Sequence, residues 1–210
     1  MHAAHAALPE RFNFAHHLLV LNKDRHAKLA YRDDHHTLTY GELNQQVRCF
    51  AASLLAHGIK PEQRVLIVML DTIDMPVAFL GALYAGIIPV PVNTLLPAEN
   101  YAYMLEHSDA QLVIVSDALL PVVQQALQQS SHKAPLLISG KADPAGDSFE
   151  SFLQSAPLKE AANTHADQFA LWLYSSGSTG QPKGTVHTHA NLYWTAELYG
   201  KPVMQVREDD

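Results

Sequence analysis

Short apolar runs alternate with segments of helical periodicity along most of the chain. The apolar runs have the length of buried strands and cover residues 64–70 (RVLIVML), 87–92 (IIPVPV), 111–116 (QLVIVS) and 136–139 (LLIS). Helices are expected between them, over 97–107 and 118–129 among others. This order predicts an α/β fold of mostly parallel βαβ layers, with helices covering both faces of the sheet.

Local signals place several element ends. A helix over 39–58 is predicted from apolar residues at helical spacing, and Gly58 is a suitable helix stop. Asp71 or Thr72 is the expected N-cap of a helix that runs to Tyr84, with Pro76 near its first turn. The two prolines in 87–92 favour an edge strand or a strand end.

The last part of the chain follows a different plan. After a short helix over 148–154, we expect a strand over 168–174, a loop over 175–184, a strand over 185–189 and a helix over 191–199. The predicted organisation is therefore an α/β subdomain over 1–167, followed over 168–210 by a strand-loop-strand unit and a helix.

Composition narrows the possible partners. The 210 residues carry a net charge of −7 and contain no basic run, which argues against nucleic-acid binding. The single cysteine, Cys49, cannot form an intrachain disulfide, and no apolar run has the length of a signal peptide or membrane span. These features predict a cytoplasmic protein without a membrane partner. The thirteen histidines show no metal-ligand spacing and are interpreted mainly as surface residues.

The loop over 175–184 (SSGSTGQPKG) has the composition of an anion-binding loop. Glycines let the backbone approach a ligand closely, hydroxyl groups add donors, and Lys183 adds a full positive charge. The alternative without a binding function is a flexible linker, but a Pro-Lys-Gly triplet directly between two apolar strands is unusual in linkers. A Walker A loop requires Gly-Lys-Ser/Thr, whereas Lys183 lies between Pro182 and Gly184, and the Rossmann glycine spacing is absent as well.

Residues 174–184 (YSSGSTGQPKG) resemble the signature loop of the adenylate-forming superfamily, which includes acyl- and aryl-CoA synthetases, peptide-synthetase adenylation domains and luciferases. Segments 38–43 (LTYGEL), 58–61 (GIKP), 81–86 (GALYAG) and 89–93 (PVPVN) agree with this resemblance, which extends from about residue 12 to residue 210. Segments 8–14 (LPERFNF), 187–191 (HTHAN) and 193–200 (YWTAELYG) are most similar to benzoate–CoA ligases.

The resemblance implies a ligase that uses ATP and Mg²⁺ to activate a carboxylic acid, with benzoate as the expected acid, and then transfers the acyl group to coenzyme A. It implies that Lys183 and Thr179 are catalytic and that Thr179 also binds the metal. Phosphate binding is implied for Ser175, Ser176, Gly177, Ser178, Thr179, Gly180, Lys183 and Gly184. The two last-named glycines, Gly180 and Gly184, are expected to act through the conformation of the loop.

Relatives of this superfamily are much longer. We therefore expect the chain to be an incomplete N-terminal AMP-binding domain without the C-terminal domain, inactive by itself and prone to self-association through an uncovered sheet face. Two alternatives stay open at this stage. The acid could be a fatty acid or a hydroxycinnamate, or the chain could be a non-catalytic module that binds a nucleotide or a partner.

Two further groups near the loop have both a functional and a structural interpretation. His187 and His189 lie two apart on the predicted strand, so they should share one face; a metal pair or a base is less expected than structural histidines. Tyr193 and Trp194 could line an aromatic pocket, but aromatic residues on a helix more often pack in the core.

Overall fold

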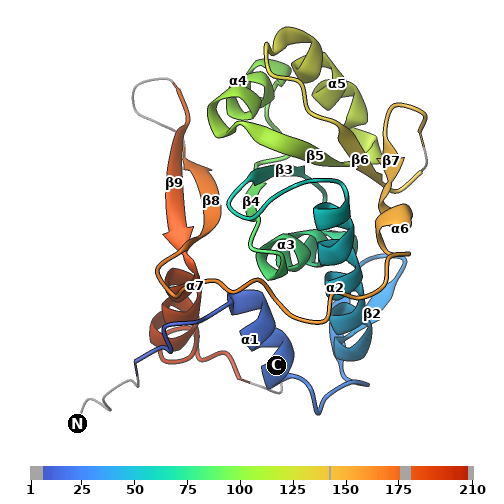
Figure 1. Ribbon diagram of the computed structural model, residues 1–210. Coiled ribbons are helices and arrows are strands. Elements are labelled where there is room, and N and C mark those ends of the chain that lie inside the picture. Colours follow the sequence, from blue (N-terminus) through green and yellow to red (C-terminus); the bar gives the residue numbers. More distant parts are fainter. Residues whose placement is uncertain (1–6, 142, 176–180, 208–210) are drawn as a thin grey trace.

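The computed structural model describes residues 7–141, 143–175 and 181–207 (Figure 1). Its strands are β1 (Leu29–Arg32), β2 (Thr37–Thr39), β3 (Arg64–Val68), β4 (Ile88–Pro91), β5 (Ala110–Ser116), β6 (Leu136–Ser139), β7 (Asp147–Ser148), β8 (Phe169–Ser175) and β9 (Lys183–Thr188). Its helices are α1 (Phe14–Leu21), α2 (Tyr40–Ala56), α3 (Asp74–Tyr84), α4 (Ala98–Ser108), α5 (Leu120–Gln129), α6 (Phe149–Phe152) and α7 (His189–Thr195). A 3-10 turn at Asp117–Leu119 precedes α5, and a π-helical turn at Ala196–Gly200 follows α7.

The centre of the fold is a parallel five-stranded sheet in the order β4-β3-β5-β6-β7. Helices cover both faces, with α2 and α3 on one side and α4 and α5 on the other (Figure 1). The side chains of β3 alternate between the two layers: Val65 and Ile67 join the core with α2 and α3, while Leu66 and Val68 join the core with α4 and α5. The predicted doubly covered parallel sheet is confirmed.

Most predicted element ends agree with the structure. α2 begins with a capping box in which Thr39 and Glu42 satisfy each other's backbone N–H groups, and Gly58 after the helix has a φ of 81°. β4, which contains Pro89 and Pro91, is at the edge of the sheet as expected.

The predicted cap of α3 is wrong. The helix begins at Asp74 with Ile73 as its N-cap, and neither Asp71 nor Thr72 caps it. The backbone N–H of Ile73 donates instead to the Asp33 carboxylate, at 3.0 Å. Asp33 lies between β1 and β2, so the helix start is set by a residue far away in the sequence. Hydrogen bonds from backbone N–H groups, with that of Ile73 the largest contribution, hold the pKa of Asp33 near 2.

Four elements lie outside the sequence-based prediction: helix α1, the antiparallel strands β1 and β2, and the two-residue strand β7. Asn13 caps α1 by accepting from the His16 N–H, and its side-chain amide donates to the Leu83 carbonyl at 2.8 Å. α1 thereby packs against α3. No helix in the described part of the chain is both long and apolar enough to cross a membrane.

The strand-loop-strand unit is an antiparallel hairpin of β8 and β9 that forms a sheet separate from the main one (Figure 1). β8 lies against the edge strand β4, and α7 after the hairpin contacts α1. The hairpin unit is thus held by the main sheet through β8 and by the N-terminal segment through α7.

Candidate functional site

The loop end of the β8–β9 hairpin brings two of the predicted phosphate-binding residues together. Ser175 is the last residue of β8, Lys183 is the first residue of β9, and the two are directly paired in the ladder. Residues that face each other in an antiparallel pair project from the same side of the sheet. The Ser175 hydroxyl and the Lys183 ammonium group therefore lie on one face of the hairpin, and both residues are exposed.

The hairpin is longer than the sequence indicates. Ser175, Lys183 and Gly184 were expected in the loop, but all three belong to strands, because the ladder continues through the pairs Tyr174–Gly184 and Ser175–Lys183. The remaining predicted phosphate and metal ligands lie outside the described residues, and their roles stay predictions: Ser176, Gly177, Ser178, Thr179 and Gly180.

Four aromatic side chains join the hairpin to helix α4. The Tyr174 hydroxyl lies 2.8 Å from His107 Nδ1 and 3.5 Å from the Met104 carbonyl oxygen. Tyr174 stacks with Trp172 at 5.9 Å between ring centroids, and the His107 ring meets the edge of Trp172 at 5.5 Å. Tyr103 stacks with His107 at 5.3 Å. These rings hold the strand that ends at Ser175 against a well-packed helix.

Gly184 has a packing reason to be glycine. It does not adopt a positive φ, so backbone conformation alone does not require it. A Cβ atom at this position would instead overlap the indole of Trp172. The indole Nε1 is buried without a hydrogen-bond partner among the described residues, so packing sets the position of the ring. The structure therefore gives a steric reason for a glycine at this position, and the expected role of Gly184 in the conformation of the loop stays a prediction.

His187 and His189 do not form a pair on one strand face. His187 is in β9, but His189 is the first residue of α7, where Thr188 and Asn191 form a capping box. The His189 side chain is buried, its Nδ1 accepts the Phe14 N–H at 3.2 Å, and burial lowers its pKa to about 4. His189 is thus a neutral structural residue that ties α7 to α1.

Tyr193 and Trp194 on α7 take part in aromatic packing contacts. The Tyr193 ring meets the edges of Phe12 at 5.8 Å and His17 at 5.4 Å, and it contacts Trp194 at 5.0 Å. These contacts pack α7 against the N-terminal segment.

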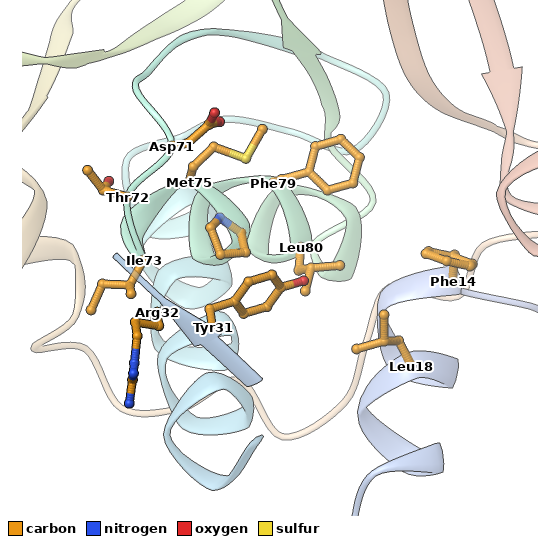
Figure 2. Close-up of a pocket in the computed structure, with 11 residues that line it drawn as sticks. Phe14, Leu18, Tyr31, Arg32, Asp71, Thr72, Ile73, Met75, Phe79 and Leu80 are labelled. Carbon is orange, nitrogen blue, oxygen red and sulfur yellow. The ribbon is translucent and has the colours of Figure 1, made fainter. Parts of the chain in front are cut away.

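A separate hollow of about 410 Å³ opens between α1, β1 and the start of α3 (Figure 2). Its wall is mainly apolar and aromatic, with Phe14, Tyr31 and Phe79 among the lining side chains. Arg32 and Asp71 add charged groups to the wall. No residue of the β8–β9 hairpin lines this hollow, so it is separate from the candidate phosphate site.

The described part of the hairpin offers a hydroxyl and an ammonium group, which together suit an anion. The described residues contain no cluster of three or more His, Cys, Asp or Glu side chains that could hold a metal ion. The sequence prediction identified Ser175 and Lys183 but not His107 and Trp172. Nothing in the spacing of these two aromatic residues connects them with the loop, because the contact between α4 and β8 exists only in the folded chain.

Comparison with known proteins gives a consistent result. Residues 20–210 match the family model described as AMP-binding enzyme. Over 207 residues the chain is 43% identical to the benzoate–CoA ligase of Thauera aromatica, covering 97% of this chain and 39% of the relative. It is 38% identical to the 4-hydroxybenzoate–CoA/benzoate–CoA ligase of Rhodopseudomonas palustris, covering 89% of this chain and 34% of that protein.

Solved structures agree with these matches. A benzoate CoA ligase from Burkholderia xenovorans superposes with a TM-score of 0.86 at 52% identity, over 94% of this chain and 38% of that one. An anthranilate CoA ligase in complex with anthranoyl-AMP gives a TM-score of 0.90 at 28% identity, over 96% and 39% of the two chains. The chain thus spans about two fifths of the length of these relatives.

Proposed function

The chain belongs to the family of AMP-binding enzymes, and from this premise we propose that it supplies the nucleotide-phosphate-binding hairpin of an ATP-dependent ligase for aromatic carboxylic acids. The observation that carries the proposal is the pairing of Ser175 with Lys183 in the hairpin, at the two ends of a Gly/Ser-rich loop. The proposed reaction has two steps. The acid is first joined to AMP with release of pyrophosphate, and coenzyme A then displaces AMP to give a thioester.

In the first step, negative charge on the triphosphate must be neutralised as the carboxylate attacks the α-phosphorus. The Lys183 ammonium group would contact a phosphate oxygen, and the Ser175 hydroxyl on the same face of the hairpin would donate a second hydrogen bond. Mg²⁺ bound to the triphosphate would supply further charge neutralisation. Thr179 is the proposed protein ligand of Mg²⁺, and the backbone of residues 176–180 the proposed phosphate cradle.

Benzoate or a close aromatic analogue is the proposed acid. The support is comparative: identity is 43% to a benzoate–CoA ligase and 30% to a long-chain fatty acid–CoA ligase from Mycobacterium tuberculosis. The proposed cosubstrates are ATP and coenzyme A, with Mg²⁺ as the metal. A fatty-acyl ligase is the second candidate within the same family.

Replacing Lys183 tests the phosphate role. In the protein that contains this chain, we expect Lys183→Ala to lower benzoate-dependent ATP–pyrophosphate exchange roughly 10- to 100-fold, because a hydrogen bond to a charged group is lost. Lys141→Ala is the matched control, since it also removes one exposed positive charge but lies outside the hairpin. Thioester formation from supplied benzoyl-AMP should change less, because the triphosphate is no longer involved.

Two results would contradict the proposal. Equal exchange rates for Lys183→Ala and Lys141→Ala would remove Lys183 from the phosphate site. Faster exchange with a long-chain fatty acid than with benzoate, 4-hydroxybenzoate or anthranilate would replace the aromatic acid by the second candidate.

A further inference from the structure

The aromatic contacts between α4 and the hairpin suggest a function beyond packing. We propose that His107, Tyr174 and Trp172 are positioning residues that hold Ser175 and Lys183 in the paired arrangement that binds phosphate. This inference rests on the proposed function of the hairpin. It assigns to α4, which contributes no residue to the predicted loop, control over the geometry of the loop's two ends.

The anchor of this arrangement is α4. Tyr101, Met104 and Leu105 of this helix are buried in the core that covers one face of the sheet. The Tyr101 hydroxyl also donates to the Asn93 carbonyl at 2.8 Å. His107 lies in the last turn of the helix, so its ring extends from a firmly packed element toward β8.

The Tyr174 hydroxyl has a partner in either tautomer of His107. If His107 Nδ1 is unprotonated, the hydroxyl donates to it at 2.8 Å; if Nδ1 carries the proton, the hydroxyl accepts it and can donate to the Met104 carbonyl at 3.5 Å. Burial raises the pKa of Tyr174, which keeps the hydroxyl proton in place. Tyr174 is directly followed by Ser175, so this contact fixes the β8 end of the loop.

Trp172 fixes the other strand. Its indole occupies the space next to Gly184 that a side chain would otherwise fill. Gly184 directly follows Lys183, and Trp172 in turn contacts both Tyr174 and His107. A continuous series of ring contacts therefore runs from α4 to the residues next to Ser175 and Lys183. A shift of either strand end would break one of these contacts.

Calorimetric titration of the protein with MgATP tests the inference. We expect Tyr174→Phe and His107→Ala each to weaken MgATP binding about 3- to 10-fold, the effect of losing one neutral hydrogen bond. The double variant should bind MgATP about as well as His107→Ala, because His107→Ala already removes the contact that Tyr174→Phe removes. His107→Asn should restore most of the affinity, since its side-chain amide can place a polar atom near the position of Nδ1.

Tyr101→Phe is the matched control. It removes a tyrosine hydroxyl hydrogen bond from the same helix without touching the hairpin. We expect it to lower the free energy of unfolding but to leave MgATP affinity unchanged. If it weakens MgATP binding as much as Tyr174→Phe does, the effect is general destabilisation and the positioning role is excluded.

The remaining outcomes separate the two proposals. Wild-type affinity in Tyr174→Phe and His107→Ala, together with weaker binding in Lys183→Ala, would overturn the positioning role and leave the phosphate role standing. No measurable MgATP binding by the wild type, or unchanged binding in Lys183→Ala, would overturn the phosphate role and the positioning role with it.

Discussion

At the scale of single residues, the packing of the hairpin depends on Gly184, which has no side chain. Gly184 follows Lys183 of the proposed phosphate-binding loop and has no positive φ, yet the Trp172 indole leaves no room for a Cβ atom there. A glycine in a phosphate loop is usually explained by backbone freedom or close approach to the ligand. Here the close approach is made by another residue of the same hairpin.

We therefore expect Gly184→Ala to lower the free energy of unfolding by about 1–3 kcal/mol, the usual cost of inserting a methyl group into a packed region. Urea denaturation measures this change. In a Trp172→Leu background the same substitution should cost much less, because the overlapping ring is gone. Gly200→Ala is the control, since a Cβ atom at Gly200 has only one neighbour, at 3.9 Å. Equal costs of Gly184→Ala in both backgrounds would contradict the steric explanation.

At the scale of elements, the sequence predicted what depends on local pattern and missed what depends on distant contacts. Leu66 and Ile67 on one strand belong to opposite cores. A continuous apolar run between segments of helical periodicity predicts such a strand, buried on both faces. The start of α3 could not be predicted from its own sequence, because the backbone N–H of its N-cap residue, Ile73, donates to the distant Asp33. The sequence placed Ser175 and Lys183 in the loop and did not predict their pairing, and it did not indicate the contact with His107 on α4.

The boundary between β9 and α7 was also predicted wrongly, but here a local signal was present in the sequence. Thr188 and Asn191 have the spacing of a capping box, and they begin the helix at His189. Because the helix begins at this residue, His189 is not part of β9, and its side chain is buried with 1% exposure. The position of a single helix end thus decides whether His189 is a candidate ligand or a structural residue.

The buried His189 predicts how stability depends on pH. Its pKa is lowered by burial from 6.5 to about 4, so the folded state disfavours the charged form. The free energy of unfolding should be highest above pH 6.5 and fall as the pH drops toward 4, by an amount on the order of 3 kcal/mol from this group. Urea denaturation between pH 7 and about pH 4.5 measures the slope before most carboxylates titrate.

His189→Asn should flatten this slope, because asparagine can accept the Phe14 N–H without gaining charge. His187→Asn makes the same change on the neighbouring strand β9 and is the control for the substitution itself. Burial also lowers the pKa of His17, and this contribution is common to all three proteins. Identical slopes in His189→Asn and the wild type would show that His189 is not the group responsible.

At the scale of the whole molecule, apolar side chains are exposed on the hairpin and on the segment after α7. The hairpin exposes Phe169, Leu173 and Val186, at 56%, 38% and 38%. The segment after α7 exposes Val203, Met204 and Val206, each by more than half. β9 is also an edge strand, with no described strand on its outer side. Apolar side chains beside an open strand edge favour association between chains.

We therefore expect the 210-residue chain to self-associate at micromolar concentration, measured by sedimentation velocity. Val186→Lys on β9 should increase the monomer fraction, because a charged side chain on an edge strand opposes pairing. Leu95→Lys is the control: Leu95 is 88% exposed, lies outside the hairpin and receives the same change in net charge. If both variants increase the monomer fraction equally, the change in net charge explains the effect and the hairpin face does not. A monodisperse wild-type monomer would contradict the expectation altogether.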